Sequence, residues 1–196
     1  MEACRLVATD LACRRGERLL FRGVSLRLEA GSALQVTGAN GIGKSSLLRI
    51  LAGLLRPLAG EVTRQGTVAL LDERPALDEH RPLGQALKFW TRIDAGEGAP
   101  LALMGLAELG EVPVRYLSTG QRKRAAIARM MGQQAPIWLL DEPLNGLDSA
   151  AAAWFEGLVE QHCQRGGIAI IASHQKFALA GLASLPLSQF QAARVE

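Results

Sequence analysis

Apolar residues along this chain gather in short, nearly continuous runs, separated by longer segments with a helical pattern. The runs at Ala33–Thr37, Ile137–Leu140 and Ile168–Ala172 are typical of parallel strands that are covered on both faces. Apolar positions three and four residues apart predict helices over Lys44–Leu55, Gln121–Gln133 and Ala150–Gln164. Strands and helices that alternate in this way predict an α/β fold built on a parallel sheet.

The front of the chain has a different pattern, with shorter apolar pieces and turn residues between them. These pieces predict strands at Leu6–Leu11, Val24–Leu28, Glu61–Thr63 and Thr67–Leu71, with a turn over Arg14–Arg18. The front is therefore expected to be rich in β structure.

The middle of the chain reads as helical but interrupted. Helices are predicted over Gly84–Trp90 and Leu101–Leu109, with a break at Gly96–Gly98. This is the natural place for an inserted helical lobe, which we expect to occupy roughly residues 75–133. The whole of residues 1–196 is expected to form a single domain, because 196 residues of which 48% are hydrophobic suffice for one well-buried core.

Charge and cysteine content add little to this picture. The net charge of +3 is compatible with an anionic ligand, a nucleic acid or a membrane surface. The three cysteines show no metal-ligand spacing, so we expect buried thiols in a reducing compartment. No apolar run reaches about 18 residues and the N-terminus lacks a secretory pattern, so any membrane attachment is expected to come from another protein.

The most informative motif is GANGIGKSS, which lies between a predicted strand and a predicted helix. It fits the phosphate-binding pattern of Gly, four residues, Gly, Lys and Ser or Thr. Its glycines allow backbone N–H groups to converge on phosphates, Lys44 would neutralise phosphate charge, and the Ser45 hydroxyl would bind Mg²⁺. The residues predicted to bind nucleotide are Gly38, Ala39, Asn40, Gly41, Ile42, Gly43, Lys44, Ser45 and Ser46.

Two acidic residues end the buried strand in IWLLDEP, where parallel sheets bind their ligands. This segment resembles a Walker B element, in which Asp141 would hold Mg²⁺ and Glu142 would act as the catalytic base on a water molecule. The alternative is a strand that is merely capped by two solvated acids. The presence of GANGIGKSS upstream favours the functional interpretation.

LSTGQ, at Leu117–Gln121, begins another predicted helix. Ser118 or Thr119 can cap this helix, and a helix N-terminus with a glycine can also bind an anion. The segment closely resembles the signature motif of ATP-binding cassette (ABC) ATPases, and it lies between the two preceding motifs as in that family. LNGLD at Leu144–Asp148 resembles the family's D-loop, and His174 in Ala172–His174 resembles its H-switch.

The resemblance covers nearly the whole chain, from Leu6 to about His174, and implies a definite architecture and site. The fold would be a P-loop NTPase of the ABC nucleotide-binding type, with a small antiparallel β subdomain and a short helical lobe. Two copies would pair head to tail, so that the signature of one faces the ATP of the other. The implied roles are catalysis by Glu142 and His174, Mg²⁺ binding by Ser45 and Asp141, a D-loop contact by Asp148, and signature contacts in trans by Ser118, Thr119, Gly120 and Gln121.

Two positions depart from the family pattern. Where ABC ATPases usually carry a glutamine between core and helical lobe, this chain has Arg74, which cannot bind Mg²⁺. The first turn lacks the usual aromatic partner for adenine, and Arg15 is either a stacking partner or a solvated turn residue. A basic cluster at Arg122–Arg124 and Arg129 has no interleaved aromatic residues, so we expect a solvated face and no direct contact with nucleic acid.

A finer resemblance concerns the segment Arg15–Phe21, the string LDEPLNGLD and the pair His174–Gln175. These are similar to the ATP-binding subunits of cytochrome c maturation systems, the haem exporter ATPases. The resemblance implies an ATPase that uses ATP and Mg²⁺ and works with an integral membrane permease at the cytoplasmic face of the bacterial inner membrane. Alternatives are the ATPase of another small exporter for lipid, drug or peptide, a soluble ABC ATPase acting on nucleic acid or ribosomes, and a P-loop kinase.

Overall fold

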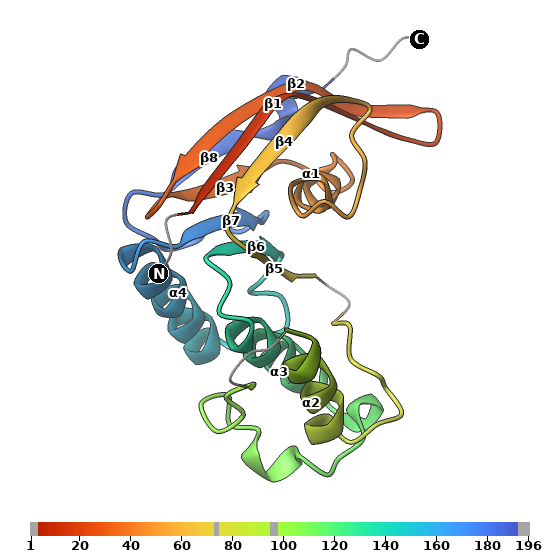
Figure 1. The fold of residues 1–196 in the computed structure, drawn as a ribbon, viewed down its shortest axis with the longest axis vertical. Coiled ribbons are helices and arrows are strands. Elements are labelled where there is room, and N and C mark those ends of the chain that lie inside the picture. Colours follow the sequence, from red (N-terminus) through yellow and green to blue (C-terminus); the bar gives the residue numbers. More distant parts are fainter. Residues whose placement is uncertain (1–3, 73–74, 95–97, 192–196) are drawn as a thin grey trace.

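A computed structural model describes residues 4–72, 75–94 and 98–191. Its main feature is a parallel sheet in which strands distant in the sequence lie side by side (Figure 1). Across the sheet the order is β5 (Val68–Leu71), β6 (Ile137–Asp141), β7 (Ile168–Ala172), β3 (Ala33–Thr37) and β8 (Ala183–Pro186). All neighbouring pairs run parallel, which confirms the fold class predicted from the apolar runs.

Side chains alternate along each central strand and pack into two separate apolar cores. On β6, Ile137 and Leu139 belong to one apolar cluster, while Trp138 and Leu140 belong to the other. Because successive side chains point to opposite faces of a sheet, a strand buried on both sides needs apolar residues at every position. That requirement explains why the central strands were predictable from their continuous runs of apolar residues.

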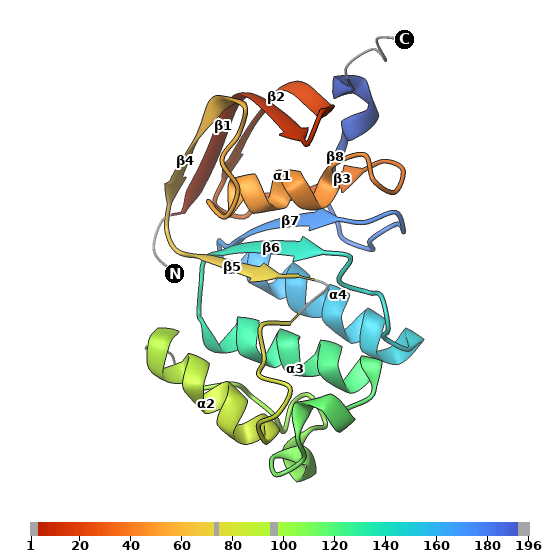
Figure 2. The same ribbon diagram turned by 90° about the vertical axis from the view of Figure 1, so that its right-hand side faces the viewer.

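One core lies between the parallel sheet and a smaller antiparallel sheet. The smaller sheet has the order β2 (Arg18–Glu29), β1 (Arg5–Arg15) and β4 (Ala59–Gln65). Helix α1 (Lys44–Leu51) lies between the two sheets, as Figure 2 shows, and buries Leu47, Leu48 and Leu51. The predicted β-rich front end is thus present, and its strands are longer than expected because β1 and β2 form one hairpin through the turn at residues 16–17.

The opposite face of the parallel sheet carries the remaining α-helices. Helices α3 (Thr119–Gly132) and α4 (Ser149–Gln164) cover this face, and α2 (Leu83–Asp94) packs against α3 farther from the sheet (Figure 2). Asp148 caps α4, since its side chain accepts a hydrogen bond from the Ala151 N–H. Short 3-10 helices at Ala107–Leu109, Val114–Tyr116 and Leu187–Phe190 complete the described segments.

Several predicted boundaries were wrong. Helix α1 ends at Leu51, because the N–H groups of Leu54 and Leu55 both turn back to the carbonyl of Arg49. The predicted helix at Leu101–Leu109 is a series of turns with a single 3-10 turn at its end. Within it, Gly105 has a φ of 62°, a conformation that no α-helix contains.

Candidate functional site

The GANGIGKSS segment joins β3 to α1 and forms a loop at the carboxyl end of the sheet. Gly38, Gly41 and Gly43 have φ angles of 146°, 75° and 117°, which side-chain-bearing residues rarely adopt. Gly43 is the residue before the first turn of α1, and Ile42 is buried beneath the loop. The loop therefore presents the N-terminus of α1 at the sheet edge, where a phosphate group can bind.

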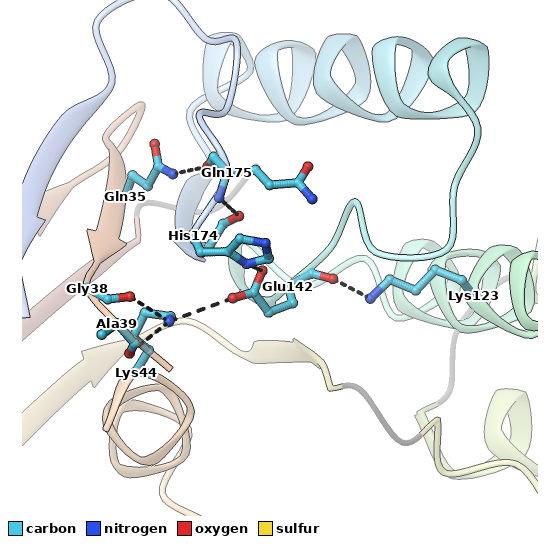
Figure 3. Close-up of polar contacts among 9 residues, drawn as sticks. Gln35, Gly38, Ala39, Lys44, Lys123, Glu142, His174 and Gln175 are labelled. Carbon is cyan, nitrogen blue, oxygen red and sulfur yellow. Dashed lines mark hydrogen bonds and ion pairs between the residues drawn. The ribbon is translucent and has the colours of Figure 1, made fainter. Parts of the chain in front are cut away.

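Three side chains from separate elements meet beside this loop (Figure 3). Lys44 Nζ donates to the carbonyls of Gly38 and Ala39, at 2.9 and 3.4 Å, and lies 3.8 Å from Glu142 Oε1. The other carboxylate oxygen of Glu142 lies 3.0 Å from His174 Nδ1. Lys44 and Glu142 are both more than 90% buried, so their charges interact with little solvent screening.

The backbone of Glu142 is held in an uncommon conformation. Its φ is 43°, in the left-handed region that costs a residue with a side chain about 1–3 kcal/mol. Its N–H donates to the carbonyl of Ala172 on β7, and its own carbonyl accepts from Lys123 Nζ at 2.9 Å. These contacts hold the turn after β6 in the form that points the carboxylate at Lys44 and His174.

His174 is positioned by a polar residue inside the sheet. Gln35, buried on β3, donates through Nε2 to the carbonyl of Gln175, and the Gln175 N–H donates to Ser173 Oγ. This pair of bonds fixes the segment after β7 on which His174 sits (Figure 3). The role of Gln35 was not foreseen, although a glutamine inside an apolar strand was a signal that it has a specific partner.

A pocket of about 500 Å³ opens between the loop and these side chains. It is lined by Arg15, Arg18, Leu20, Asn40, Gly41, Gly43, Lys44, Ser45, Ser46, Glu142, Asn145 and His174. The lining is rich in donors that suit an anion, and its single acid sits beside Lys44. Asp141, buried at the end of β6, directly precedes Glu142.

LSTGQ lies at the start of α3, and its residues do not line this pocket. Ser118 and Gln121 form a capping box, in which the Ser118 hydroxyl accepts from the Gln121 N–H and the Gln121 side chain accepts from the Ser118 N–H. Ser118 and Thr119 are exposed, and none of residues 118–121 is among the described residues that line the pocket. Within one chain, the structure does not bring the signature segment to the glycine loop.

The basic residues of α3 do not form the solvated face that was expected. Arg122 donates to the Leu117 carbonyl, Arg124 to the Met104 carbonyl, and Lys123 is buried. The Arg129 guanidinium stacks over the Trp90 ring, 3.6 Å from its centre, and burial lowers the pKa of Arg129. The expectation failed because each cation lies next to a carbonyl or a ring contributed by a neighbouring segment.

Two other sequence expectations have different outcomes. Arg74 lies outside the described residues, so its position opposite the family glutamine stays a prediction. Cys4, Cys13 and Cys163 are free and buried, as expected, and burial raises the pKa of the Cys163 thiol to about 11. Burial with a raised pKa is typical of structural thiols, and the expectation of buried thiols is confirmed.

The glycine loop at the N-terminus of α1, the acidic end of β6 and the histidine after β7 together define a P-loop nucleotide-binding protein of the ABC type. The chain matches the ABC transporter family over residues 21–145. It is similar in fold to an ABC transporter ATP-binding protein from Pyrococcus furiosus, with a TM-score of 0.80, 21% identity, and coverage of 96% of this chain and 100% of the other.

Closer relatives narrow the family. A Novosphingobium aromaticivorans protein named cytochrome c biogenesis ATP-binding export protein CcmA is 60% identical, over 97% of this chain and all of its own length. The protein of the same name from Zymomonas mobilis is 50% identical, over 96% of this chain and 86% of its own. The chain belongs to the CcmA family of ABC transporter ATP-binding proteins, and its enzymatic class is ATPase.

Proposed function

We propose that this chain is the ATP-hydrolysing subunit of a cytochrome c biogenesis export system that handles haem. The observation that carries the proposal is the meeting of Lys44, Glu142 and His174 beside the glycine loop, at 3.8 and 3.0 Å. A cation, a carboxylate and an imidazole that meet beside a phosphate-binding loop are suited to act on the γ phosphate of ATP, which supports the proposal. The CcmA relatives supply the biological context. The chain would act as one nucleotide-binding domain over residues 1–196, with a helical lobe near 75–133.

Each residue of the pocket has a proposed part in hydrolysis. Lys44 and the N–H groups of the loop bind the β and γ phosphates, and Arg15 at the pocket wall stacks on the adenine. Glu142 accepts a proton from the attacking water, and its buried position next to Lys44 and His174 keeps the carboxylate oriented. His174 holds the carboxylate and faces the γ phosphate.

The site also has oxygen atoms suited to Mg²⁺. Ser45 lines the pocket beside Lys44, and Asp141 supplies a buried carboxylate at the adjoining strand end. A hydroxyl and a carboxylate are ligands that Mg²⁺ prefers, so these two residues would hold the ion. When bound, Mg²⁺ neutralises part of the phosphate charge.

A second copy would complete the site. The exposed Ser118 and Thr119, together with Gly120 and Gln121, form a helix N-terminus that is suited to an anion but does not line the nucleotide pocket of its own chain. In a head-to-tail homodimer each signature faces the ATP of the partner, and Asp148 lies at the D-loop contact. Each ATP is then shared by two subunits.

Export requires a membrane-spanning partner. Among the described residues, no helix has the length and apolar character needed to cross a bilayer. We place the chain as a peripheral protein at the cytoplasmic face of the bacterial inner membrane, bound to integral permease subunits. The carbonyl and ring contacts of Arg122, Arg124 and Arg129 support the expectation of no direct nucleic-acid contact.

Copurification tests this assignment. The tagged chain is isolated from gently solubilised membranes of its own organism, its bound proteins are identified, and the ATPase rate of the complex is measured. Recovery of cytochrome c biogenesis membrane proteins with ATP hydrolysis is expected. Recovery of permeases for lipid, drug or peptide would contradict the cytochrome c assignment, and recovery of ribosomes or DNA would contradict a transport role.

A further inference from the structure

A buried lysine ties the helix that begins with the signature segment to the catalytic strand end. Lys123 lies in the second turn of α3, with only 9% of its surface exposed. Its Nζ donates to the backbone carbonyl of Glu142 at 2.9 Å, across 19 positions of sequence (Figure 3). Burying an ammonium group is costly unless it has such acceptors, so this contact is specific.

The acceptor is the backbone carbonyl of Glu142, the residue whose side-chain carboxylate faces Lys44 and His174. Glu142 has a φ of 43°, and strained conformations of this kind persist only where surrounding contacts determine them. Its carbonyl also accepts from the Asn145 N–H, at a longer 3.3 Å. Of these two bonds to the Glu142 carbonyl, Lys123 therefore supplies the shorter, and it comes from outside the turn.

The same stretch of α3 also carries the signature segment. Ser118 and Lys123 are five residues apart, which is about 7.5 Å along a helix axis. The first turn of α3 packs closely on the D-loop, because a Cβ atom on Gly120 would lie 2.9 Å from the Gly146 carbonyl oxygen. A displacement of the start of α3 would therefore be transmitted to the turn that contains Glu142.

We infer that Lys123 is a positioning residue that couples the two ATP sites of the dimer. The inference rests on the proposed function, in which the signature of one chain contacts ATP bound to its partner. ATP bound to the partner would contact Ser118, Gly120 and Gln121 of this chain. That contact would set the position of this chain's α3. Lys123 would then carry that position to the Glu142 of its own chain, which serves the other ATP.

The test compares two lysine variants with a matched neighbour. Lys123→Met removes the bond and keeps the length of the side chain, while Lys123→Arg keeps a cationic donor. Arg124→Met removes a comparable bond from the same helix, but its acceptor is Met104, within the helical lobe. The full chain of each variant, purified with its membrane partners, is assayed for ATP affinity, melting temperature and hydrolysis rate across ATP concentrations.

For Lys123→Met we expect the maximal rate to fall about 10- to 100-fold, as for other losses of alignment around a catalytic group. We also expect the Hill coefficient for ATP to fall from above 1 to 1, with ATP affinity within about twofold of wild type. Lys123→Arg and Arg124→Met should retain most of the rate and the cooperativity.

Three results would overturn the inference while leaving the proposed function intact. These are wild-type-like rate and cooperativity in Lys123→Met, equal losses in Lys123→Met and Arg124→Met, and a wild-type enzyme that hydrolyses ATP with no cooperativity. A wild-type complex that binds no ATP and hydrolyses none would instead contradict the proposed function itself.

Discussion

The two ends of the parallel sheet each hold a histidine contact, and the two contacts differ in kind. At the carboxyl end, His174 meets the carboxylate of Glu142, which in turn faces Lys44. At the amino end, His162 from α4 stacks on the Trp138 ring at 3.8 Å and bonds through Nε2 to the Pro136 carbonyl. The first end gathers charges, whereas the second pairs neutral groups with the backbone.

The environments explain why only one end is a candidate for chemistry. His162 is 8% exposed, and burial lowers its pKa, so the ring is kept neutral. The His174 side chain is 48% exposed and lines the pocket. The comparison teaches that the charged groups around a histidine, more than the residue type, make it a candidate for chemistry, since a histidine is present at both ends of the sheet.

Among the substitutions at the two ends of the sheet, Glu142→Gln should have the largest effect on ATP hydrolysis. The amide keeps the size of the side chain but cannot accept the proton of water, so we expect ATP hydrolysis to fall about 10²- to 10⁴-fold. ATP binding should persist. The measurement is steady-state phosphate release together with the dissociation constant for ATP. Unchanged turnover would remove Glu142 from the mechanism.

Lys44→Ala should act on binding itself. Removing one partner of a buried charge pair costs about 2–5 kcal/mol, which corresponds to an affinity for ATP that is weaker by about 30-fold or more. Titration calorimetry with ATP measures this directly. The neighbouring cation Arg49, which pairs with Asp72 away from the pocket, offers a control in Arg49→Ala, for which ATP affinity should be retained. Equal losses in both variants would argue against a phosphate contact by Lys44.

His162→Gln removes the stacking contact with Trp138 at the amino end of the sheet and should have the smallest effect on catalysis. Loss of the stacked ring should lower the free energy of unfolding by about 1–3 kcal/mol, while the ATPase rate of the folded protein stays within twofold. The measurement is denaturant unfolding alongside the hydrolysis assay. A large loss of activity with unchanged stability would contradict the division between the two ends.

The pH dependence of unfolding sharpens the same prediction. In the unfolded chain His162 takes up a proton near its ordinary pKa of 6.5, whereas in the folded chain burial lowers that pKa. The unfolded state therefore binds more protons below pH 6.5, and wild-type stability should fall as the pH falls, by up to about 1.4 kcal/mol per pH unit from this group. The difference in stability between wild type and His162→Gln should shrink over the same range, whereas a constant difference would show that His162 does not titrate differently on folding.

The sheet was predictable because burial on both faces leaves a continuous apolar signal. The predicted bounds of β3 and β7 agree with the structure, and β6 differs by one residue. The edge strand β8 at Ala183–Pro186 was not predicted, since it is short, partly exposed and contains serine and proline. An edge strand pairs on one side only, so its sequence is less constrained.

The helical lobe was harder to predict because its backbone is satisfied by distant segments. The N–H of Leu83 donates to the Val112 carbonyl, and the N–H of Gly84 donates to the Gly110 carbonyl. Such pairings leave no local period in the sequence. In Leu101–Leu109 the backbone bonds are local but of the turn type, since the N–H groups of Met104 and Leu106 both donate to the Leu101 carbonyl, and the φ of 62° at Gly105 interrupts any helix.

The pocket lining shows the same contrast at the level of single residues. Lys44, Ser45, Glu142 and His174 were recognised because each belongs to a motif with fixed spacing. Lys123 and Gln35 were not assigned a part in the site, since their partners lie 19 and 140 residues away and only folding brings them together. Motifs thus located the pocket, and the structure supplied the bonds that hold it.

The central claim is that the charged end of the sheet becomes a complete ATP site only when a second copy adds its signature segment. The most direct measurement is the mass of the Glu142→Gln chain in solution with ATP, by light scattering, and the same measurement after adding Ser118→Arg. As a control, Glu142→Gln is combined with Ser184→Arg instead of Ser118→Arg, because Ser184 is exposed on the edge strand β8. We predict an ATP-dependent dimer for Glu142→Gln and for the Ser184→Arg control, and an ATP-bound monomer with Ser118→Arg. A dimer that forms equally well with Ser118→Arg would contradict the claim.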